Sequence, residues 1–164
     1  MTDCVLGIDI GTTGTRALMV DIDGHVVGGS THDYPLSQPR PGWAEQDPAH
    51  WLHAAKTAVR AVVERYGERR RVVAIGLTGQ MHGLVLLDAN GAVLRPSIIW
   101  ADQRTTAQCA ALTNLVGGRS RLIELTCNPA LEGFTAPKLM WVREYEPDIY
   151  QRVAHVLLPK DYVR

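Results

Sequence analysis

Strand-forming and helix-forming patterns alternate along the N-terminal half of the chain, and their order restricts the fold more than any other feature. Short apolar runs separated by polar turns predict an antiparallel meander, with strands over CVLGIDI, TRALMVD and HVVGGSTH. The pair Asp23 and Gly24 predicts a hairpin turn between the second and third strands. A period of three to four residues then runs from Asp47 to Tyr66 and predicts an amphipathic helix, with Asp47 as N-cap and Pro48 at the first helical position.

A further apolar run, RRVVAIGLTGQ, follows this helix and predicts a strand that is buried on both faces. Beyond it, LVLLDANGAVL predicts a hairpin around Asn90 and Gly91, whereas the proline-rich PLSQPRPGWAEQDP predicts an irregular crossing loop. We expect short strands over PSIIW and HVLLP, and helices over TTAQCAALTNLVG, RSRLIELT and APKLMWVREY. This order predicts an α/β fold with a mixed sheet flanked by helices. The last segment, LPKDYVR, is typical of a starting helix, so we expect residues 1–164 to form an incomplete domain.

Composition and charge exclude several classes of protein. Apolar residues make up 46% and charged residues 21% of the 164-residue chain, as in soluble globular proteins. Lysine plus arginine and aspartate plus glutamate number 17 each, so no net charge attracts nucleic acid or an anionic membrane. The cysteines have neither zinc-ligand nor disulfide-framework spacing, which fits a reducing cytoplasm. No apolar stretch is long enough for a membrane span or a signal peptide.

The stretch GIDIGTTGTR combines an acid with glycines and hydroxyl groups at the end of the first predicted strand. Glycine permits positive φ and close approach of the backbone, and successive N–H and threonine hydroxyl groups can bind an oxyanion. Asp9 would repel a phosphate there unless Mg²⁺ lay between them, and an acid that closes a buried apolar strand is costly unless it is paired or metal-bound. The alternative is a tight structural turn without a ligand. The candidate residues are Asp9, Gly11, Thr12, Thr13, Gly14, Thr15 and Arg16.

Two later strand ends carry polar side chains in the same manner. In LTGQMHG, Gln80 and His82 can hydrogen-bond a polyhydroxylated ligand, and Met81 can pack against its apolar face. In IIWADQR, Trp100 can lie against sugar C–H groups and Asp102 can accept from hydroxyls. The alternatives are a structural histidine and an Asp102 that caps the following helix. Because α/β sheets bind ligands at the carboxyl ends of their strands, three such ends in one sheet favour a binding site.

Taken together, a set of segments carries a resemblance over essentially the whole chain: GIDIGTTGTRALMVD, PGWAEQDP, GLTGQMHGLVLLD, PSIIWADQRT, GFTAPKLMWVREYEP and VLLPKDYVR. They resemble the N-terminal part of the FGGY carbohydrate kinases. Glycerol kinases of this family usually carry arginine and glutamate where Met81 and His82 stand, so the resemblance is closest to the xylulokinase branch. It implies an actin-like, ribonuclease-H-like α/β domain, which the family has twice, with the active site between the two halves. Residues 1–164 would then be a truncated N-terminal domain, with the C-terminal FGGY domain absent from this chain.

The resemblance also implies a role for each candidate residue. Asp9 would act near the γ-phosphate and hold the metal, directly or through water. The loop that touches the nucleotide phosphates would consist of Gly11, Thr12, Thr13, Gly14 and Arg16. Met81 and His82 would contact the ketose. The neighbours of that pair would be Gln80, Trp100 and Asp102.

The implied reaction is transfer of the γ-phosphate of ATP to D-xylulose, with Mg²⁺, to give D-xylulose 5-phosphate. The family's catalytic base is an aspartate in a downstream Gly/Asp-rich motif that has no match here, so we expect this chain alone to be inactive. The alternatives are another FGGY sugar or polyol kinase, such as glycerol kinase or gluconokinase, or a non-catalytic truncated sugar-binding fragment. The expected partners are the ketose and the missing C-terminal half of the kinase, with no nucleic acid and no membrane. The complete enzyme could form a homodimer in the cytoplasm.

Overall fold

The computed structural model describes residues 1–164, which divide into two compact units. Unit 1 consists of Met1–Leu36, Asp47–Gln80 and Pro159–Arg164, and unit 2 consists of Ser37–Gln46 and Met81–Leu158. Each unit has its own packed core and is described by itself. None of the helices has the length and apolar character needed to cross a membrane.

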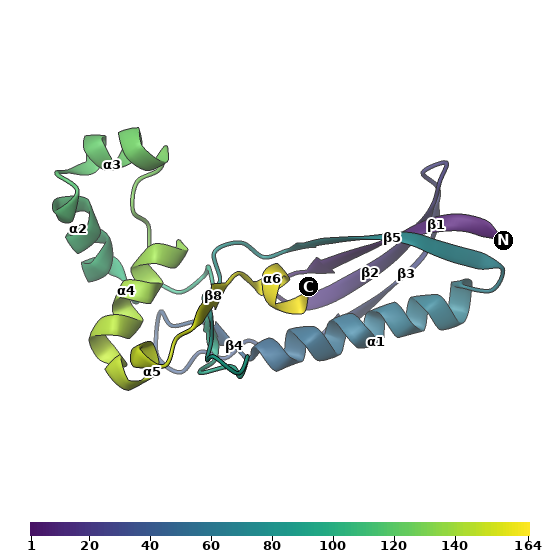
Figure 1. Ribbon diagram of the computed structural model, residues 1–164, viewed down its shortest axis with the longest axis horizontal. Coiled ribbons are helices and arrows are strands. Elements are labelled where there is room, and N and C mark those ends of the chain that lie inside the picture. The colour runs from purple at the N-terminus through teal and green to yellow at the C-terminus, as the bar shows by residue number, and fades with distance from the viewer. The chain divides into compact units, whose positions relative to one another are not determined.

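Unit 1 is a four-stranded mixed sheet with one long helix against one face (Figure 1). Its strands are β1 (Thr2–Ile10), β2 (Gly14–Asp21), β3 (Val26–Asp33) and β5 (Arg70–Gly79), in the order β3-β2-β1-β5. The pairs β1–β2 and β2–β3 are antiparallel, whereas β1 and β5 are parallel. The predicted meander, the strand after GTTGT and the mixed sheet are therefore confirmed. The turn at Gly24 is confirmed too, and its φ of +88° explains the glycine.

The helix α1 (Pro48–Tyr66) begins and ends where its period predicted. The Asp47 side chain accepts a hydrogen bond from the Ala49 N–H at 2.9 Å, which confirms it as the N-cap. α1 packs on β1, β2 and β3 through its apolar stripe. The core formed there contains Cys4, Leu6, Ala17, Met19, Ala58 and Val62.

We expect the substitution Asp47→Ala to lower the free energy of unfolding by about 1 kcal/mol, because it leaves the Ala49 N–H without its acceptor. Urea unfolding followed by circular dichroism measures this. Glu64→Ala, on the exposed face of the same helix, is the matched control and should change the free energy by less than about 0.5 kcal/mol. Equal losses in the two variants would contradict the capping role.

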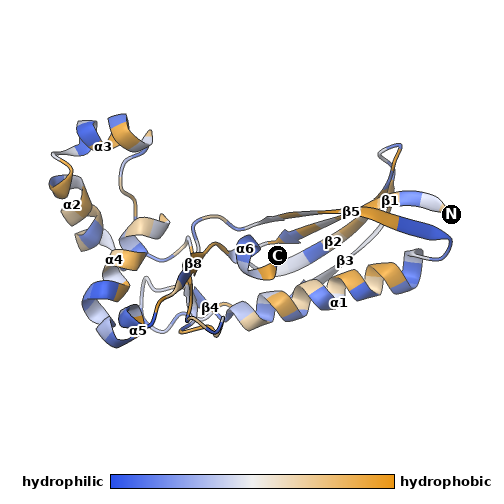
Figure 2. Cartoon of the chain, in the orientation of Figure 1, coloured by the Kyte–Doolittle hydropathy of each residue, from blue (hydrophilic) through white to orange (hydrophobic).

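The strand β5 is exposed, so the prediction that it is buried on both faces is wrong. Val73 is 49% and Ile75 58% exposed. The reason is that β5 is an edge strand, and α1 packs on β1, β2 and β3 without covering it. Figure 2 shows the apolar middle of β5 with no helix over it. An apolar run indicates a preference for a sheet, but only neighbouring elements can bury its faces.

Unit 2 combines two small sheets with helices. The sheets pair β4 (Glu45–Gln46) with β7 (Ser97–Ile98) and β6 (Val85–Leu87) with β8 (His155–Leu157). The predicted helices are confirmed as α2 (Thr106–Leu115), α3 (Arg119–Thr126) and α4 (Thr135–Tyr145), and the short α5 (Pro147–Gln151) was not predicted. The core contains Leu84, Leu86, Ile98, Trp141 and Val142.

Four shorter predictions have mixed outcomes. The segment HVLLP forms β8, and the helix expected at the end of the chain is α6 (Pro159–Val163), which belongs to unit 1. The predicted crossing loop is irregular except for β4, whose two residues find partners in β7. The turn at Gly91 is confirmed, with φ of +80°, but the second arm of that hairpin is a single bridge from Leu87 to Val93 instead of a strand.

Candidate functional site

The turn between β1 and β2 is tight and is braced by Tyr34. The Gly11 N–H donates to the Gly14 carbonyl at 3.0 Å. Tyr34 donates from its N–H to the Thr13 carbonyl at 3.1 Å and from its hydroxyl to the Gly11 carbonyl at 2.5 Å. Neither glycine has a positive φ, so that part of the reasoning about them is wrong. What excludes a larger residue at Gly14 is close packing, because a Cβ there would lie 2.9 Å from the backbone carbonyl oxygen of His32.

The side chains of this turn divide between the two faces of the sheet. Thr15 is fully buried on the face toward α1, so its hydroxyl does not contribute to an open cradle. Thr13 and Arg16 are exposed, and Thr12 is half-buried. The hydroxyl and cationic groups of this turn that are not fully buried are therefore those of Thr12, Thr13 and Arg16, and their role as phosphate contacts stays a prediction.

Asp9 lies near the end of β1 on the face opposite α1. Its neighbours in register are Arg16 of β2 and Thr78 of β5. Asp9 is exposed, and no hydrogen bond or ion pair engages its carboxylate. Asp9 is therefore not the costly buried acid that the sequence predicted, because Ile8 and Ile10 are the residues of this strand end that turn toward α1. A carboxylate held on a strand without a partner remains available to a cation.

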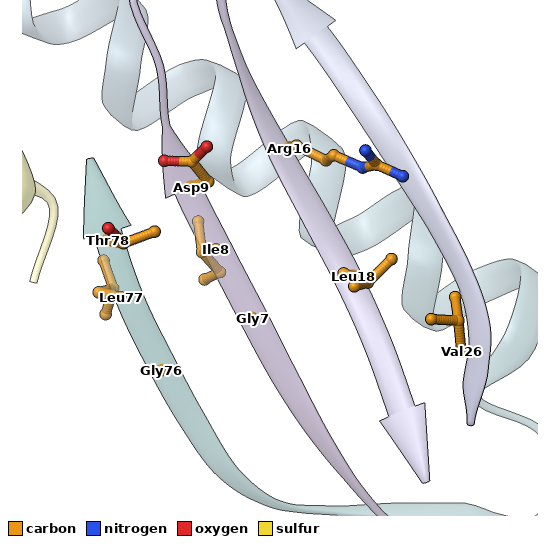
Figure 3. Close-up of a pocket in the computed structure, with 9 residues that line it drawn as sticks. All are labelled: Gly7, Ile8, Asp9, Arg16, Leu18, Val26, Gly76, Leu77 and Thr78. Atoms are coloured by element: carbon orange, nitrogen blue, oxygen red, sulfur yellow. The ribbon is translucent and has the colours of Figure 1, made fainter. Parts of the chain in front are cut away.

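This face of the sheet carries an open hollow of about 530 Å³ (Figure 3). Its floor is bare backbone, because Gly7 and Gly76 are register partners on adjacent strands, and a Cβ built on either would meet nothing within 4 Å. Asp9 and Thr78 stand at one end of the hollow. A free carboxylate and a hydroxyl are oxygen ligands of the kind that Mg²⁺ accepts together with substrate phosphates, so these residues fit the implied metal.

The second group of candidate residues lies in unit 2, on both sides of one antiparallel bridge. Leu84 pairs with Ile98, and the Leu84 N–H donates to the Ile98 carbonyl at 3.0 Å. His82 and Trp100 each stand two residues beyond this bridge, at its same end. Met81 is 64% and Trp100 45% exposed, so both can meet a ligand from solvent. The structure thus brings the predicted sugar contacts of the two segments to one end of a strand pair.

The His82 imidazole faces an apolar cavity of about 340 Å³. Its ring lies 4.4 Å from the Phe134 ring, measured between centroids. Burial and then the positive charge of Lys138 lower the pKa of His82, so the imidazole is neutral at pH 7. A neutral imidazole has one N–H donor and one acceptor nitrogen, a combination that suits a sugar hydroxyl. The rest of the lining is Leu112, Leu122, Thr126, Asn128, Pro129, Ala130, Ala136 and Pro137.

Asp102 is fully buried, and its carboxylate is already engaged within unit 2. It accepts a hydrogen bond from the Ala44 N–H at 2.6 Å and forms an ion pair with Arg104 at 2.6 Å. Arg104 also pairs with Glu45 at 2.7 Å, and its guanidinium lies 3.6 Å from the centre of the Trp43 ring. Asp102 thus anchors the segment after Trp100, and its proposed place as a neighbour of the sugar stays a prediction.

Two expectations about these strand ends need correction. Helix α2 begins at Thr106 with Thr105 as N-cap, so Asp102 does not cap it. The three strand ends do not share a sheet, because β7 pairs with β4 apart from the four-stranded sheet. Only the ends of β1 and β5 meet, where the Gln80 N–H donates to the Ile10 carbonyl at 2.7 Å. Gln80 therefore belongs to unit 1, and the residues after it belong to unit 2.

Sequence reasoning missed two residues that support the candidate site. Tyr34 braces the first turn, and no pattern in the sequence points to it. Lys138 is fully buried in α4, and here a signal exists. It precedes Trp141 and Val142 by three and four residues, so it stands in the buried stripe of its helix, where a charge needs a reason.

Comparison with known proteins places this chain in one protein family. The model of the N-terminal domain of the FGGY family of carbohydrate kinases matches residues 4–164. The chain is 44% identical over 159 residues to the xylulose kinase of Escherichia coli strain K12, and the match covers 97% of this chain and 32% of that protein.

Solved structures agree with this match. The xylulose kinase from Rhodospirillum rubrum is similar with a TM-score of 0.94 and 37% identity, over 98% of this chain and 33% of that one. The gluconate kinase from Lactobacillus acidophilus is similar with a TM-score of 0.91 and 26% identity, over 99% of this chain and 32% of that one. The chain spans about a third of the length of the relatives that it matches.

Proposed function

Because this chain belongs to the FGGY family of carbohydrate kinases, we propose that it forms the N-terminal part of an enzyme that transfers the γ-phosphate of ATP to D-xylulose. The observation that carries the proposal is the exposed Asp9 carboxylate, which has no partner and stands beside Thr78 at one end of the hollow. The choice of sugar is supported by relatives that are named xylulose kinases. The domain that would complete the enzyme corresponds to the two thirds of those relatives that this chain does not match.

On the phosphate side, the residues of unit 1 hold and neutralise charge. A bound Mg²⁺ would neutralise phosphate oxygens and orient the γ-phosphoryl group. Asp9 would hold that cation, directly or through water, and the hydroxyls of Thr12 and Thr13 would donate to phosphate oxygens. Arg16, beside Asp9 on the same face, would balance the remaining negative charge. Phosphoryl transfer depends mainly on such positioning and charge stabilisation.

On the sugar side, the residues of unit 2 select and orient the acceptor. The neutral His82 imidazole would hydrogen-bond a ketose hydroxyl, and Met81 would pack against the sugar's apolar face. The exposed ring of Trp100 stands at the same end of the bridge and would extend that contact. The general base implied by the family resemblance has no match among residues 1–164.

The test uses the complete kinase, meaning residues 1–164 joined to the remainder of their natural reading frame or to the corresponding remainder of the Escherichia coli relative. ADP release with D-xylulose, D-gluconate and glycerol, each with ATP and Mg²⁺, gives kcat/KM for the three acceptors. We expect D-xylulose to have the highest value. The likeness to a gluconate kinase makes gluconate the second candidate, and a higher value for it would replace our proposal.

In the complete kinase we expect His82→Ala to lower kcat/KM for D-xylulose by about ten- to a hundredfold, because a sugar hydroxyl loses its partner. The KM for ATP should stay unchanged. His82 has φ of +60°, so His82→Asn is a useful companion variant, since asparagine tolerates this backbone conformation better than alanine. His50→Ala, exposed on α1, is the control. Equal effects on both substrates would mean that His82 is structural.

A further inference from the structure

The Lys138 ammonium is buried against backbone carbonyls of two loops. It donates to the carbonyl of His82 at 3.3 Å, to that of Phe134 at 3.1 Å and to that of Gly133. Its side chain is fully buried, and no carboxylate forms an ion pair with it. The ammonium therefore has three carbonyl acceptors for its three protons.

The His82 carbonyl is also held by a second donor from the same helix. The Thr135 hydroxyl donates to it at 3.3 Å. At the other end of the residue, the imidazole packs on the ring of Phe134, which directly precedes α4. The first turn of α4 and the residue before it thus contact His82 through its carbonyl and through its ring.

The backbone of His82 has a conformation that other contacts must stabilise. His82 has φ of +60°, in the left-handed region that residues other than glycine rarely adopt. Surrounding contacts must hold such a conformation, and residues of this kind cluster at functional sites. The donors on the His82 carbonyl act directly on this backbone and can hold it.

We propose that Lys138 is a positioning residue that fixes the left-handed turn at His82 and so aims the imidazole at the sugar. The orientation of the imidazole toward a sugar rests on the proposed function. The hydrogen bonds from Lys138 and Thr135 to the His82 carbonyl, called the clamp below, do not. Filling space alone would not require a lysine, because an apolar side chain of similar volume would fit among Trp141 and Val142 without the cost of burying a charge. The carbonyls are the reason for the ammonium.

The first experiment compares variants of the 164-residue chain by NMR, with the His82 carbonyl carbon and ring resonances as reporters. In Lys138→Met we expect the carbonyl resonance to move and the pKa of His82 to rise, since the variant removes a neighbouring positive charge. Val142→Ala, one turn further along α4, is the matched control, because it weakens the same core without touching His82. Thr135→Val, which removes the other donor, should move the carbonyl resonance in the same direction. His82 resonances that shift no more in Lys138→Met than in Val142→Ala would overturn the proposal.

A second measurement needs no substitution and so does not depend on whether a variant folds. Burial lowers the pKa of Lys138 to about 8. The charged or titratable groups that face it are Asp102, Arg104, Cys109 and His82. Burial raises the pKa of Cys109 and lowers that of His82, so neither of these two titrates where Lys138 does. Above its pKa the amine has two protons for three carbonyls. The His82 carbonyl resonance should therefore step with a midpoint near pH 8, and a flat titration would overturn the clamp.

Stability should rise with pH over the range in which the clamp on the His82 carbonyl is released. A lysine whose pKa is lowered on folding binds fewer protons in the folded than in the unfolded chain between pH 8 and its ordinary value of 10.5. Its contribution to the free energy of unfolding consequently rises as the pH rises through that window. As the pH rises through that window, we expect the His82 carbonyl resonance to move and the free energy of unfolding of the wild-type chain to increase relative to that of Lys138→Met. A parallel loss of stability would mean that folding does not lower the pKa of Lys138, and would contradict the buried ammonium on which the clamp depends.

In the complete kinase, Lys138→Met should raise KM for D-xylulose about tenfold, which corresponds to ~1.4 kcal/mol, and leave KM for ATP unchanged. A tenfold rise in both would overturn a role confined to His82. Failure of the proposed function has a different signature. In that case D-xylulose would leave the His82 resonances of the wild-type chain unmoved while the clamp titrates as expected.

Discussion

We expect the chain, purified as residues 1–164, to release no ADP above background when it is given D-xylulose, ATP and Mg²⁺. In our proposal the candidate residues of unit 1 hold a cation and contact phosphate, and those of unit 2 contact the sugar, but none matches the general base that the family resemblance implies. A positioned base contributes about 10²–10⁴-fold, and correct alignment of donor and acceptor contributes as much or more. These losses multiply, so turnover should fall below detection. A coupled assay of ADP release measures this, with the complete kinase as positive control.

Two other outcomes of that assay, in which ADP is released, would be informative. Sustained turnover that disappears in Asp9→Ala would show that the chain, or an oligomer of it, builds a working site, and would contradict the prediction. Turnover that persists in Asp9→Ala would come from a contaminating kinase. A chain without turnover whose His82 resonances respond to D-xylulose fits either a kinase fragment or a sugar-binding module, and only the complete kinase separates these two.

In the complete kinase, we expect Asp9→Asn to lower kcat about a hundredfold or more. The substitution keeps the shape of the side chain and removes the charge that would hold Mg²⁺, and a bound metal supplies several kcal/mol of charge stabilisation in the transition state. Each 1.36 kcal/mol is about tenfold in rate. The Mg²⁺ concentration needed for half-maximal rate should rise as well. Initial rates over a series of Mg²⁺ concentrations measure both effects.

Asp3→Asn is the matched control for that experiment. Asp3 lies at the other end of β1, where its carboxylate is paired with Arg71 at 2.8 Å, away from the hollow. This variant should keep the wild-type rate and the wild-type response to Mg²⁺. If Asp3→Asn loses as much activity as Asp9→Asn, the effect belongs to the stability of the sheet. If Asp9→Asn changes only KM for D-xylulose, our assignment of Asp9 to holding Mg²⁺ is wrong.

Local periodicity predicted the elements that are stabilised by contacts close in sequence. The helix Pro48–Tyr66 has its cap, its starting proline and its apolar stripe within its own residues, so all three could be read directly. The strand β5 has the composition of a buried strand, yet its burial depends on elements packed against it, and α1 packs chiefly on β2 and β3 and leaves the face of β5 exposed. The two-residue strand β4 exists through its pairing with β7, and no local pattern encodes such a partner.

The candidate site shows the same limit. The side chains of GIDIGTTGTR were found because their chemistry is unusual for a strand end, but which face each occupies depends on register, and this reversed the reasoning about Asp9. Asp102 was read as a ligand or a cap because its partner Ala44 lies far away in sequence. Lys138 could have been noticed from its place in an apolar stripe, although its acceptor at His82 could not.

At the floor of the hollow, selection for strand stability and selection for an open surface favour different residues. A glycine inside a strand costs roughly 0.5–1 kcal/mol relative to alanine, and at Gly7 and Gly76 nothing in this chain stands where a methyl group would go. Mutation under selection for folding alone would therefore favour a side chain at both positions. Lineages that keep the two glycines give up strand stability for an unobstructed surface beside Asp9, so their retention across a population would measure how strongly that opening is selected.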